Sequence, residues 1–283
     1  MLSYRHSFHA GNHGDVLKHW SLVTMLDYLN QKEKPYWYID THSGAGRYHL
    51  GDAHSQKNRE HEQGIQRLFG QRGLPESLAR YVALVTDLGG VSQNGHLQGY
   101  PGSPVIAQSL AREQDKLRLF ELHKSDSRKL ESHMGADQRV RVDASDGFAG
   151  LKALLPPPTK RGLIMIDPSY EVKSDYSKVL KVIPDAVRRF SVGVFVLWYP
   201  LLSHLDNVNF KERILKLDGM KWMDLRLCVD DRPTAQGMFG SGLFVVNPPW
   251  KLQEQALQVL PCLADKLGVN DAGAWAIRDS GNL

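Results

Sequence analysis

The segment Gly162-Leu163-Ile164-Met165-Ile166-Asp167-Pro168-Ser169-Tyr170 decides the fold class of this chain. Its first five residues form a short apolar run, which predicts a fully buried strand. Pro168 ends that strand, because proline has no N–H to donate to a sheet. A carboxylate, a carbonyl and an aromatic ring therefore follow the carboxyl end of a buried strand, where open α/β sheets bind their ligands.

The same tetrapeptide predicts a chemistry. Asp167 and the carbonyl of Pro168 form a pair of acceptors beside the ring of Tyr170. Such a group suits a flat base, because the acceptors bind the exocyclic amine while the ring stacks on the face of the base. Hydrogen bonds accepted from the amine also make it a better nucleophile. The alternative is a plain turn in which Asp167 only caps the backbone.

Outward from this segment, strand and helix patterns alternate along the chain. We predict strands at 36–39, 116–120, 140–142, 162–166 and 192–198, and helices at 16–29, 104–110, 125–133, 148–155 and 176–190. This alternation predicts an α/β, Rossmann-like fold with a doubly wound parallel sheet. Two later strands, at 222–229 and 242–246, are predicted to form an antiparallel pair before a last helix at 252–267.

The segment 47–95 differs in composition from its surroundings. It is polar, with helical patterns at 62–69 and 75–88 and no clear strand. We predict that 47–95 is a small inserted helical subdomain, and that residues 1–46 and 96–283 form the main domain. Its cations permit RNA docking, but an ordinary solvated face explains them equally well. These cations are Arg47, Lys57, Arg59, Arg67, Arg72 and Arg80.

The overall composition is that of a soluble globular protein. The 283 residues are 42% apolar and 23% charged, and the formal charge of +4 permits a polyanionic partner. Cys228 and Cys262 lie in no CxxC or Cys/His pattern, which favours two reduced thiols in a cytosolic protein. No apolar signal segment opens the chain, and the longest apolar run, 192–202, is too short to cross a bilayer. We therefore expect a cytoplasmic protein.

Three more predicted strands end in polar signals. The first runs into Asp40 and Gly44-Ala45-Gly46, whose glycines allow a tight turn and close approach of a ligand. The second ends in Glu121, where an acid accepts both ribose hydroxyls of a nucleoside. The third ends in Asp146-Gly147, which suits the amine and ring edge of an adenine. Each signal alone has a structural alternative: a generic turn, a solvated carboxylate or a helix cap.

In chain order, the four strand ends together describe a class I S-adenosylmethionine-dependent methyltransferase that acts on an amino group. A nicotinamide oxidoreductase is disfavoured, because the third glycine of GxGxxG is missing after the first strand. The proposed chemistry requires no metal, and the cofactor expected is S-adenosyl-L-methionine.

The chain also resembles, nearly end to end, the bacterial 23S rRNA adenine-N6 methyltransferase J family. Long and unusual strings carry this resemblance. They are Met1-Leu2-Ser3-Tyr4-Arg5-His6-Ser7-Phe8-His9-Ala10-Gly11-Asn12-His13, Asp15-Val16-Leu17-Lys18-His19, Asp40-Thr41-His42, Gly44-Ala45-Gly46-Arg47-Tyr48, Tyr100-Pro101-Gly102-Ser103-Pro104, Leu197-Trp198-Tyr199-Pro200 and Asn247-Pro248-Pro249-Trp250-Lys251-Leu252.

The resemblance implies a Rossmann-like methyltransferase with a small helical insertion, which acts on naked rRNA as a monomer. It implies that Asp167 is the proton acceptor and that Tyr4 lies near the substrate base. The residues that it implies around the cofactor are Lys18, His19, His42, Ser103, Glu121, Asp146, Gly147 and Asp167. One position departs from the family, whose usual motif is Asp-Pro-Pro-Tyr. Ser169 replaces the second proline and regains a free φ and an N–H, so we expect activity to persist with a less rigid loop.

A second string, Asn247-Pro248-Pro249-Trp250, also fits an amine-binding pattern. It follows a late strand, so we expect it at the far edge of the sheet, away from the glycine loop, as a structural turn. The N-terminal segment gathers cations and one aromatic ring before the first helix, which favours RNA phosphate contacts and closure over the cofactor. A metal site there is disfavoured, because His9 and His13 lack a helical context and neighbouring carboxylates. The residues concerned are Tyr4, Arg5, His6, His9, His13, Lys18 and His19.

Two alternative functions stay open on the sequence. One is a DNA adenine-N6 methyltransferase, which methylation assays on naked rRNA and duplex DNA separate from the rRNA enzyme. The other is a nucleic-acid-binding protein of external DNA utilisation with a vestigial cofactor fold. Calorimetry with S-adenosylmethionine tests the second alternative, because a vestigial site binds no cofactor.

Overall fold

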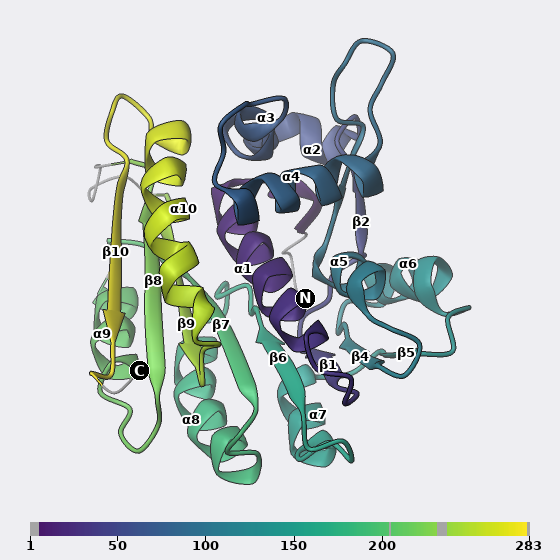
Figure 1. The fold of residues 1–283 in the computed structure, drawn as a ribbon, viewed down its shortest axis with the longest axis vertical. Helices are drawn as coiled ribbons and strands as arrows, with labels where there is room; N and C mark the ends of the chain where they lie inside the picture. The colour runs from purple at the N-terminus through teal and green to yellow at the C-terminus, as the bar shows by residue number, and fades with distance from the viewer. Residues whose placement is uncertain (1–5, 204, 231–236, 282–283) are drawn as a thin grey trace.

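A computed structural model describes residues 6–203, 205–230 and 237–281 of the chain. Its centre is an eight-stranded sheet in the order β10-β8-β9-β7-β6-β1-β4-β5 (Figure 1). Neighbours among β5, β4, β1, β6 and β7 pair in parallel, whereas β9, β8 and β10 each pair antiparallel with their neighbours. The bounds are β1 (Trp37–Asp40), β4 (Lys116–Phe120), β5 (Val140–Asp143), β6 (Gly162–Ile166), β7 (Val194–Leu201), β8 (Trp222–Cys228), β9 (Gly240–Val246) and β10 (Ala274–Asp279).

Helices pack on both faces of this sheet, and each face has its own apolar core. The side that carries α1 (Figure 1) also holds α4, α5, α6 and α10, and the other side holds α7, α8 and α9. The predicted doubly wound α/β fold is thereby confirmed. The helix bounds are α1 (His13–Asn30), α4 (Glu76–Gly89), α5 (Ser103–Leu110), α6 (Lys124–Met134), α7 (Gly147–Leu154), α8 (Ser174–Arg189), α9 (Leu205–Ile214) and α10 (Lys251–Leu267).

The strand that opened the sequence argument lies where it was predicted. All five residues of β6 are buried, and the bounds of the strand are those of the apolar run. β1 lies between β6 and β4, so the chain winds away from β1 in both directions. Such a reversal opens a crevice at the carboxyl ends of the strands, and doubly wound proteins bind ligands in it.

A small group of elements lies between β1 and α5. β2 (Arg47–His49) and β3 (Gly99–Pro101) pair antiparallel, and they enclose short helical turns and α4. We predicted no strand between 47 and 95, and β2 is therefore a correction. It was missed because three residues are too few to establish an alternation of polar and apolar positions. The remaining elements are η1 (His6–Phe8), which precedes α1, and α2 (Ala53–Asn58), η2 (Glu60–Gln63) and α3 (Ile65–Leu68).

Several cations of this inserted segment bind the protein itself. Arg67 donates to backbone carbonyls after α10, Arg80 forms an ion pair with Asp27 of α1, and Arg47 donates to the carbonyl of Leu88. Arg67 and Arg80 thus attach the segment to the end of α10 and to α1, whereas the contact of Arg47 lies within the segment. The RNA-docking interpretation of its basic composition is weaker for that reason.

The second amine-binding string is placed differently from our expectation. β9, which precedes it, is not an edge strand but lies between β7 and β8. Because β9 runs antiparallel to β7 and β6 runs parallel to it, Asn247 nevertheless lies at the opposite end of the strands from Asp167. Its side-chain amide donates to the carbonyls of Ser191 and Gly193, both at 2.8 Å. Asn247 therefore fastens a turn, as we predicted, although the reason is strand direction and not edge position.

Two further observations concern the class of protein. Both cysteines are free thiols. Among the described residues, no helix is both long and apolar enough to span a bilayer.

Candidate active site

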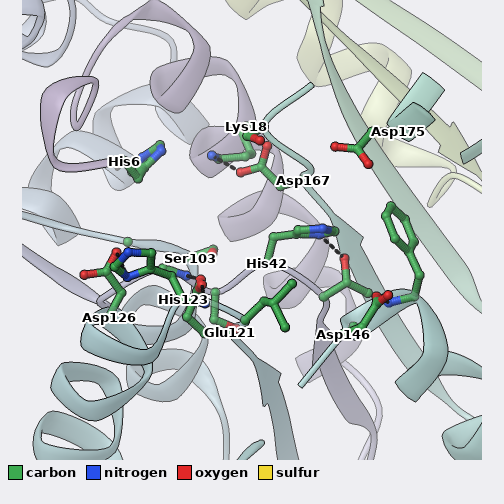
Figure 2. Close-up of a pocket in the computed structure, with 18 of the residues that line it drawn as sticks. His6, Lys18, His42, Ser103, Glu121, His123, Asp126, Asp146, Asp167 and Asp175 are labelled. Carbon is green, nitrogen blue, oxygen red and sulfur yellow. Dashed lines mark hydrogen bonds and ion pairs between the residues drawn. The ribbon is translucent and has the colours of Figure 1, made fainter. Parts of the chain in front are cut away.

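A cavity opens at the carboxyl ends of β1, β4 and β6 (Figure 2). All eight residues that we predicted around the cofactor line it, although they come from six separate segments of the chain. They are Lys18, His19, His42, Ser103, Glu121, Asp146, Gly147 and Asp167. Their contacts with a cofactor stay a prediction. Their convergence on one cavity is a finding.

The loop after β1 is ordered by a buried carboxylate. Asp40 is fully buried, and its Oδ2 accepts hydrogen bonds from the hydroxyls of Tyr38 and Ser103, both at 2.7 Å. Its Oδ1 accepts the backbone N–H of His42 at 3.2 Å. Burial raises the pKa of Asp40. Asp40 thus faces the protein, and what it holds in place is the start of the loop and of α5.

Glu121 holds the glycine part of the same loop. One carboxylate oxygen accepts the backbone N–H of Gly44 at 2.8 Å, and the other accepts that of His123 at 2.6 Å. Gly44 has φ +61°, which favours glycine, and a Cβ there would lie 2.2 Å from the hydroxyl of Tyr48. Burial raises the pKa of Glu121. A carboxylate oxygen has room for two acceptor contacts, so each oxygen keeps one for a ribose hydroxyl.

Asp146 and Gly147 begin α7 at the third strand end. Asp146 caps the helix through the backbone N–H of Phe148 at 2.8 Å, which is the structural alternative that we named. A Cβ on Gly147 would lie 2.2 Å from the carbonyl of Thr41. Only glycine therefore lets α7 approach the loop after β1 and close this side of the cavity.

The end of β6 brings Asp167 against Lys18. The carboxylate accepts a hydrogen bond from Lys18 Nζ at 2.5 Å (Figure 2). The same ammonium lies 2.8 Å from Asp15. Burial disfavours the ammonium, but the carboxylates of Asp15 and Asp167 outweigh it and raise the pKa of Lys18. Sequence reasoning missed this pair, because 149 residues separate its members and no local pattern reports it.

Three comparisons with known proteins point to one family. A family model described as "Ribosomal RNA large subunit methyltransferase D, RlmJ" matches residues 33–279. A protein of Escherichia coli strain K12, named "Ribosomal RNA large subunit methyltransferase J", is 46% identical over 268 residues, which is 94% of both chains. A protein of the same name from Haemophilus influenzae is 42% identical over 98% of both chains.

The chain belongs to the ribosomal RNA large subunit methyltransferase J family. A solved structure of a Legionella pneumophila protein has the same fold, with a TM-score of 0.88, 35% identity and coverage of 97% of this chain and 100% of that one. Membership confirms the predicted family, the Rossmann-like methyltransferase fold, the enzyme class and S-adenosylmethionine as the cofactor.

The cavity fits the cofactor of this family. S-adenosylmethionine, when bound, supplies a methyl group on a positively charged sulfur. Acids that line the cavity suit that charge and the ribose, and Lys18 and Lys178 are cations for a carboxylate. The acids are Glu121, Asp126, Asp146, Asp167 and Asp175. Among the described residues, no cluster of His, Cys, Asp and Glu suited to a metal ion occurs.

Two histidines of the family's site are neutral at neutral pH. His19 Nδ1 lies 2.7 Å from the hydroxyl of Tyr100, and burial lowers the pKa of His19 to about 3. His42 packs against Phe148 with 4.9 Å between ring centroids, and burial lowers the pKa of His42 to about 4. Both rings therefore offer a hydrogen-bonding or apolar surface and no charge.

Tyr170 does not lie where we expected the base to stack. Its backbone has φ +54°, and this left-handed turn directs the ring into the core. The ring is 8% exposed, packs on Tyr176 at 4.6 Å between centroids, and its hydroxyl donates to the carbonyl of Trp198. In this conformation Tyr170 supports the loop. Ser169, the departure from the family motif, lines the cavity in its place.

Some residues of the site were absent from our predictions. Thr41, Asp126, Asp175 and Lys178 line the cavity, and only proximity in sequence to a predicted residue hinted at them. His6 also lines it, which agrees with the N-terminal segment lying near the cofactor site. Tyr4 lies outside the described residues.

Proposed function

We propose that this protein transfers a methyl group from S-adenosylmethionine to the N6 amine of one adenine in naked large-subunit rRNA. The observation that carries the proposal is the place of Asp167. It follows the central parallel strand β6, lines the cavity and is 14% exposed in its side chain, so its carboxylate is reachable from the cavity. An amine held there faces the cofactor pocket of a methyltransferase.

Asp167 and the carbonyl of Pro168 accept hydrogen bonds from N6 in this proposal. The base is unstacked from the RNA to reach them. The acceptors align the nitrogen lone pair with the methyl group, and acceleration comes mainly from this positioning in a site with little water. The amine becomes strongly acidic only after methylation, and Asp167 then takes the proton.

In this proposal, Lys18 binds Asp167 before the substrate amine does. Its ammonium occupies one oxygen of Asp167 before the substrate binds. The incoming amine takes a place on that carboxylate, and Lys18 keeps Asp15 as its second partner. The rRNA assignment is supported by the names of the two relatives, which give large-subunit rRNA as the molecule that those proteins act on. An rRNA substrate implies a cytoplasmic enzyme, and we propose that it works as a monomer, with 47–95 as a separate inserted subdomain.

One experiment tests this function directly. N6-methyladenine is mapped in rRNA from cells with and without the protein, and purified enzyme is assayed on naked rRNA and on duplex DNA. We expect one adenine of the large-subunit rRNA to lose its methyl group in the deletion strain, and transfer to rRNA alone in the assay. Preference for DNA would establish the rival adenine methyltransferase, and failure to bind S-adenosylmethionine would favour the vestigial binding protein.

A further inference from the structure

A buried carboxylate lies directly behind the cavity wall. Asp15, in the first turn of α1, is 1% exposed and is not among the residues that line the cavity. Its Oδ2 accepts hydrogen bonds from Nε2 of His6 and from the backbone N–H of Gly11, both at 2.9 Å. Its Oδ1 forms the 2.8 Å ion pair with Lys18. The two side chains that Asp15 holds, His6 and Lys18, both line the cavity.

The start of α1 does not need this carboxylate as a cap. Asn12 already caps the helix, because its side chain accepts the backbone N–H of Asp15 at 2.9 Å. An acid in the first turn also interacts with the helix dipole, but an exposed acid does that without the cost of burial. Besides the backbone N–H of Gly11, the oxygens of Asp15 bind two side chains of the site, those of His6 and Lys18.

Lys18 connects Asp15 to the reacting end of the cavity. Its side chain is 4% exposed and lies between two carboxylates, Asp15 on its own helix and Asp167 after β6. His6 faces it from η1, and the ring of Trp198 on β7 lies 5.9 Å from the ammonium. His19, the other titratable neighbour on α1, is neutral. If Asp167 were the only carboxylate partner of the buried Lys18 ammonium, the positive charge would be poorly compensated whenever Asp167 binds the substrate amine.

We propose that Asp15 is a positioning residue of the methyl-transfer site, which holds the Lys18 ammonium and the His6 ring in the cavity wall. The inference rests on the function proposed above. While the target amine occupies Asp167, Asp15 keeps Lys18 charged and in place. Asp15 touches no reacting atom and acts only through the two side chains that it binds.

The first test replaces Asp15 by its uncharged isostere. We expect Asp15→Asn to lower kcat for rRNA methylation about tenfold or more, as misplacement of a group in a reacting site does. The matched control is Asp115→Asn. Asp115 is also fully buried, binds Arg112 and the backbone of Tyr36, and lies before β4, at the opposite edge of the sheet. It should lower the melting temperature but leave kcat within about twofold.

The pH profile separates positioning from general destabilisation. In Asp15→Asn, Lys18 keeps only Asp167, so the pKa of the buried ammonium falls and kcat declines as the pH rises toward 9.5. The wild type lacks this alkaline limb. A loss of kcat that is equal at every pH, or equal to that of Asp115→Asn, would overturn the proposal.

A double-mutant cycle covers the case in which Asp15→Asn does not fold. Asp15→Asn combined with Lys18→Met leaves no unpaired buried ammonium, so the double variant is the more stable protein. If Asp15 acts through Lys18, its kcat stays within about threefold of Lys18→Met alone. A further tenfold loss in the double variant would show that the contact with Lys18 does not carry the effect of Asp15, and would overturn that part of the proposal.

A last measurement is independent of the RNA assay. The pKa of Lys18 is followed by NMR of lysine labelled at Cε, with Lys18→Arg for assignment. Asp15→Asn should lower that pKa whatever the substrate is. If the wild type methylates no RNA but the pKa falls, the proposed function fails and the link from Asp15 to Lys18 stands. If the enzyme methylates rRNA but the pKa of Lys18 is unchanged in Asp15→Asn, the proposed function stands and the link from Asp15 to Lys18 is wrong.

Discussion

Two tetrapeptides of this protein have a similar sequence pattern but lie at opposite ends of the parallel strands. Asp167-Pro168-Ser169-Tyr170 follows β6, and Asn247-Pro248-Pro249-Trp250 follows β9. Each contains a residue with left-handed backbone, Tyr170 at φ +54° and Asn247 at φ +53°. Because β9 runs antiparallel to β7, the second string lies at the amino edge of the parallel strands. A motif of this kind therefore has catalytic meaning only together with the direction of its strand.

The two side chains are also bound differently. Asp167 pairs with a lysine that lines the cavity, and a substrate can replace that contact. Both N–H groups of the Asn247 amide are taken up by backbone carbonyls of the loop before β7, and Asn247 is part of no cavity wall described above. One group is available for chemistry and the other is committed to structure.

The largest effect expected from this comparison is at Asp167. Asp167→Ala removes an acceptor for N6 and leaves the buried ammonium of Lys18 with Asp15 alone. We expect kcat on rRNA to fall about a thousandfold, which corresponds to roughly 4 kcal/mol. Methyl transfer from labelled cofactor to naked rRNA measures it. Asn247→Ala is the control. Loss of transfer in Asn247→Ala together with survival in Asp167→Ala would reverse our assignment of the two strings.

The same control variant has its own expected result. Asn247→Ala leaves the carbonyls of Ser191 and Gly193 without partners, and alanine tolerates φ +53° poorly. We expect the free energy of unfolding to fall by about 1–3 kcal/mol with kcat unchanged. Urea denaturation measures the stability. An unfolding curve equal to that of the wild type would contradict the structural role of this turn.

A substitution at Glu121 tests cofactor binding separately from the chemistry at Asp167. Glu121→Gln keeps the size of the side chain but replaces one acceptor oxygen by a donor, so it cannot accept both backbone N–H groups of Gly44 and His123. We expect KM for S-adenosylmethionine to rise about tenfold with little change in kcat, since uniform binding is lost. Calorimetry gives the affinity directly. Glu131→Gln, at an exposed position on α6, should bind the cofactor like the wild type.

The smallest expected effect is a pH dependence of the folding stability that comes from His19. The folded state holds His19 neutral, with a pKa lowered to about 3 from 6.5, so the unfolded chain binds more protons between those values. Stability contributed by neutral His19 is therefore present above pH 6.5 and decreases as the pH falls. From pH 7.5 to 5.5 this amounts to about 1.3 kcal/mol. Between pH 7.5 and 5.5, the free energy of unfolding of His19→Gln should fall by about 1.3 kcal/mol less than that of the wild type. Urea denaturation at the two pH values measures both changes. Equal losses would show that His19 titrates normally.

The sequence was sufficient for the parallel core and for most of the cavity. The strand at 162–166 was predicted with its observed bounds, because a fully buried strand has a continuous apolar run. The strand at 116–120, in which polar and apolar residues alternate at first, was also predicted with its observed bounds. The four strand ends converge because parallel strands of one sheet end at one edge. That rule needs no tertiary information.

The failures have tertiary causes. β10 ends in Arg278 and Asp279 and is largely exposed, so no apolar pattern marks this edge strand. Tyr170 was expected to face the base, but a left-handed residue reverses the direction of its side chain, and a tyrosine, unlike glycine or asparagine, does not indicate such a φ. The contact of Lys18 with Asp167 joins α1 to β6, and only the folded chain brings the two together.

The position of β9 has a consequence for the order in which this chain is made. β7 hydrogen-bonds to β9 along seven register pairs, yet synthesis reaches the end of β7 at Leu201 well before β9 begins at Gly240. A nascent or truncated chain ending after Cys228 would carry every strand of the cavity together with one open, apolar strand edge. Such edges recruit other chains. The C-terminal part thus covers the strand edge of β7 that the catalytic half would otherwise expose.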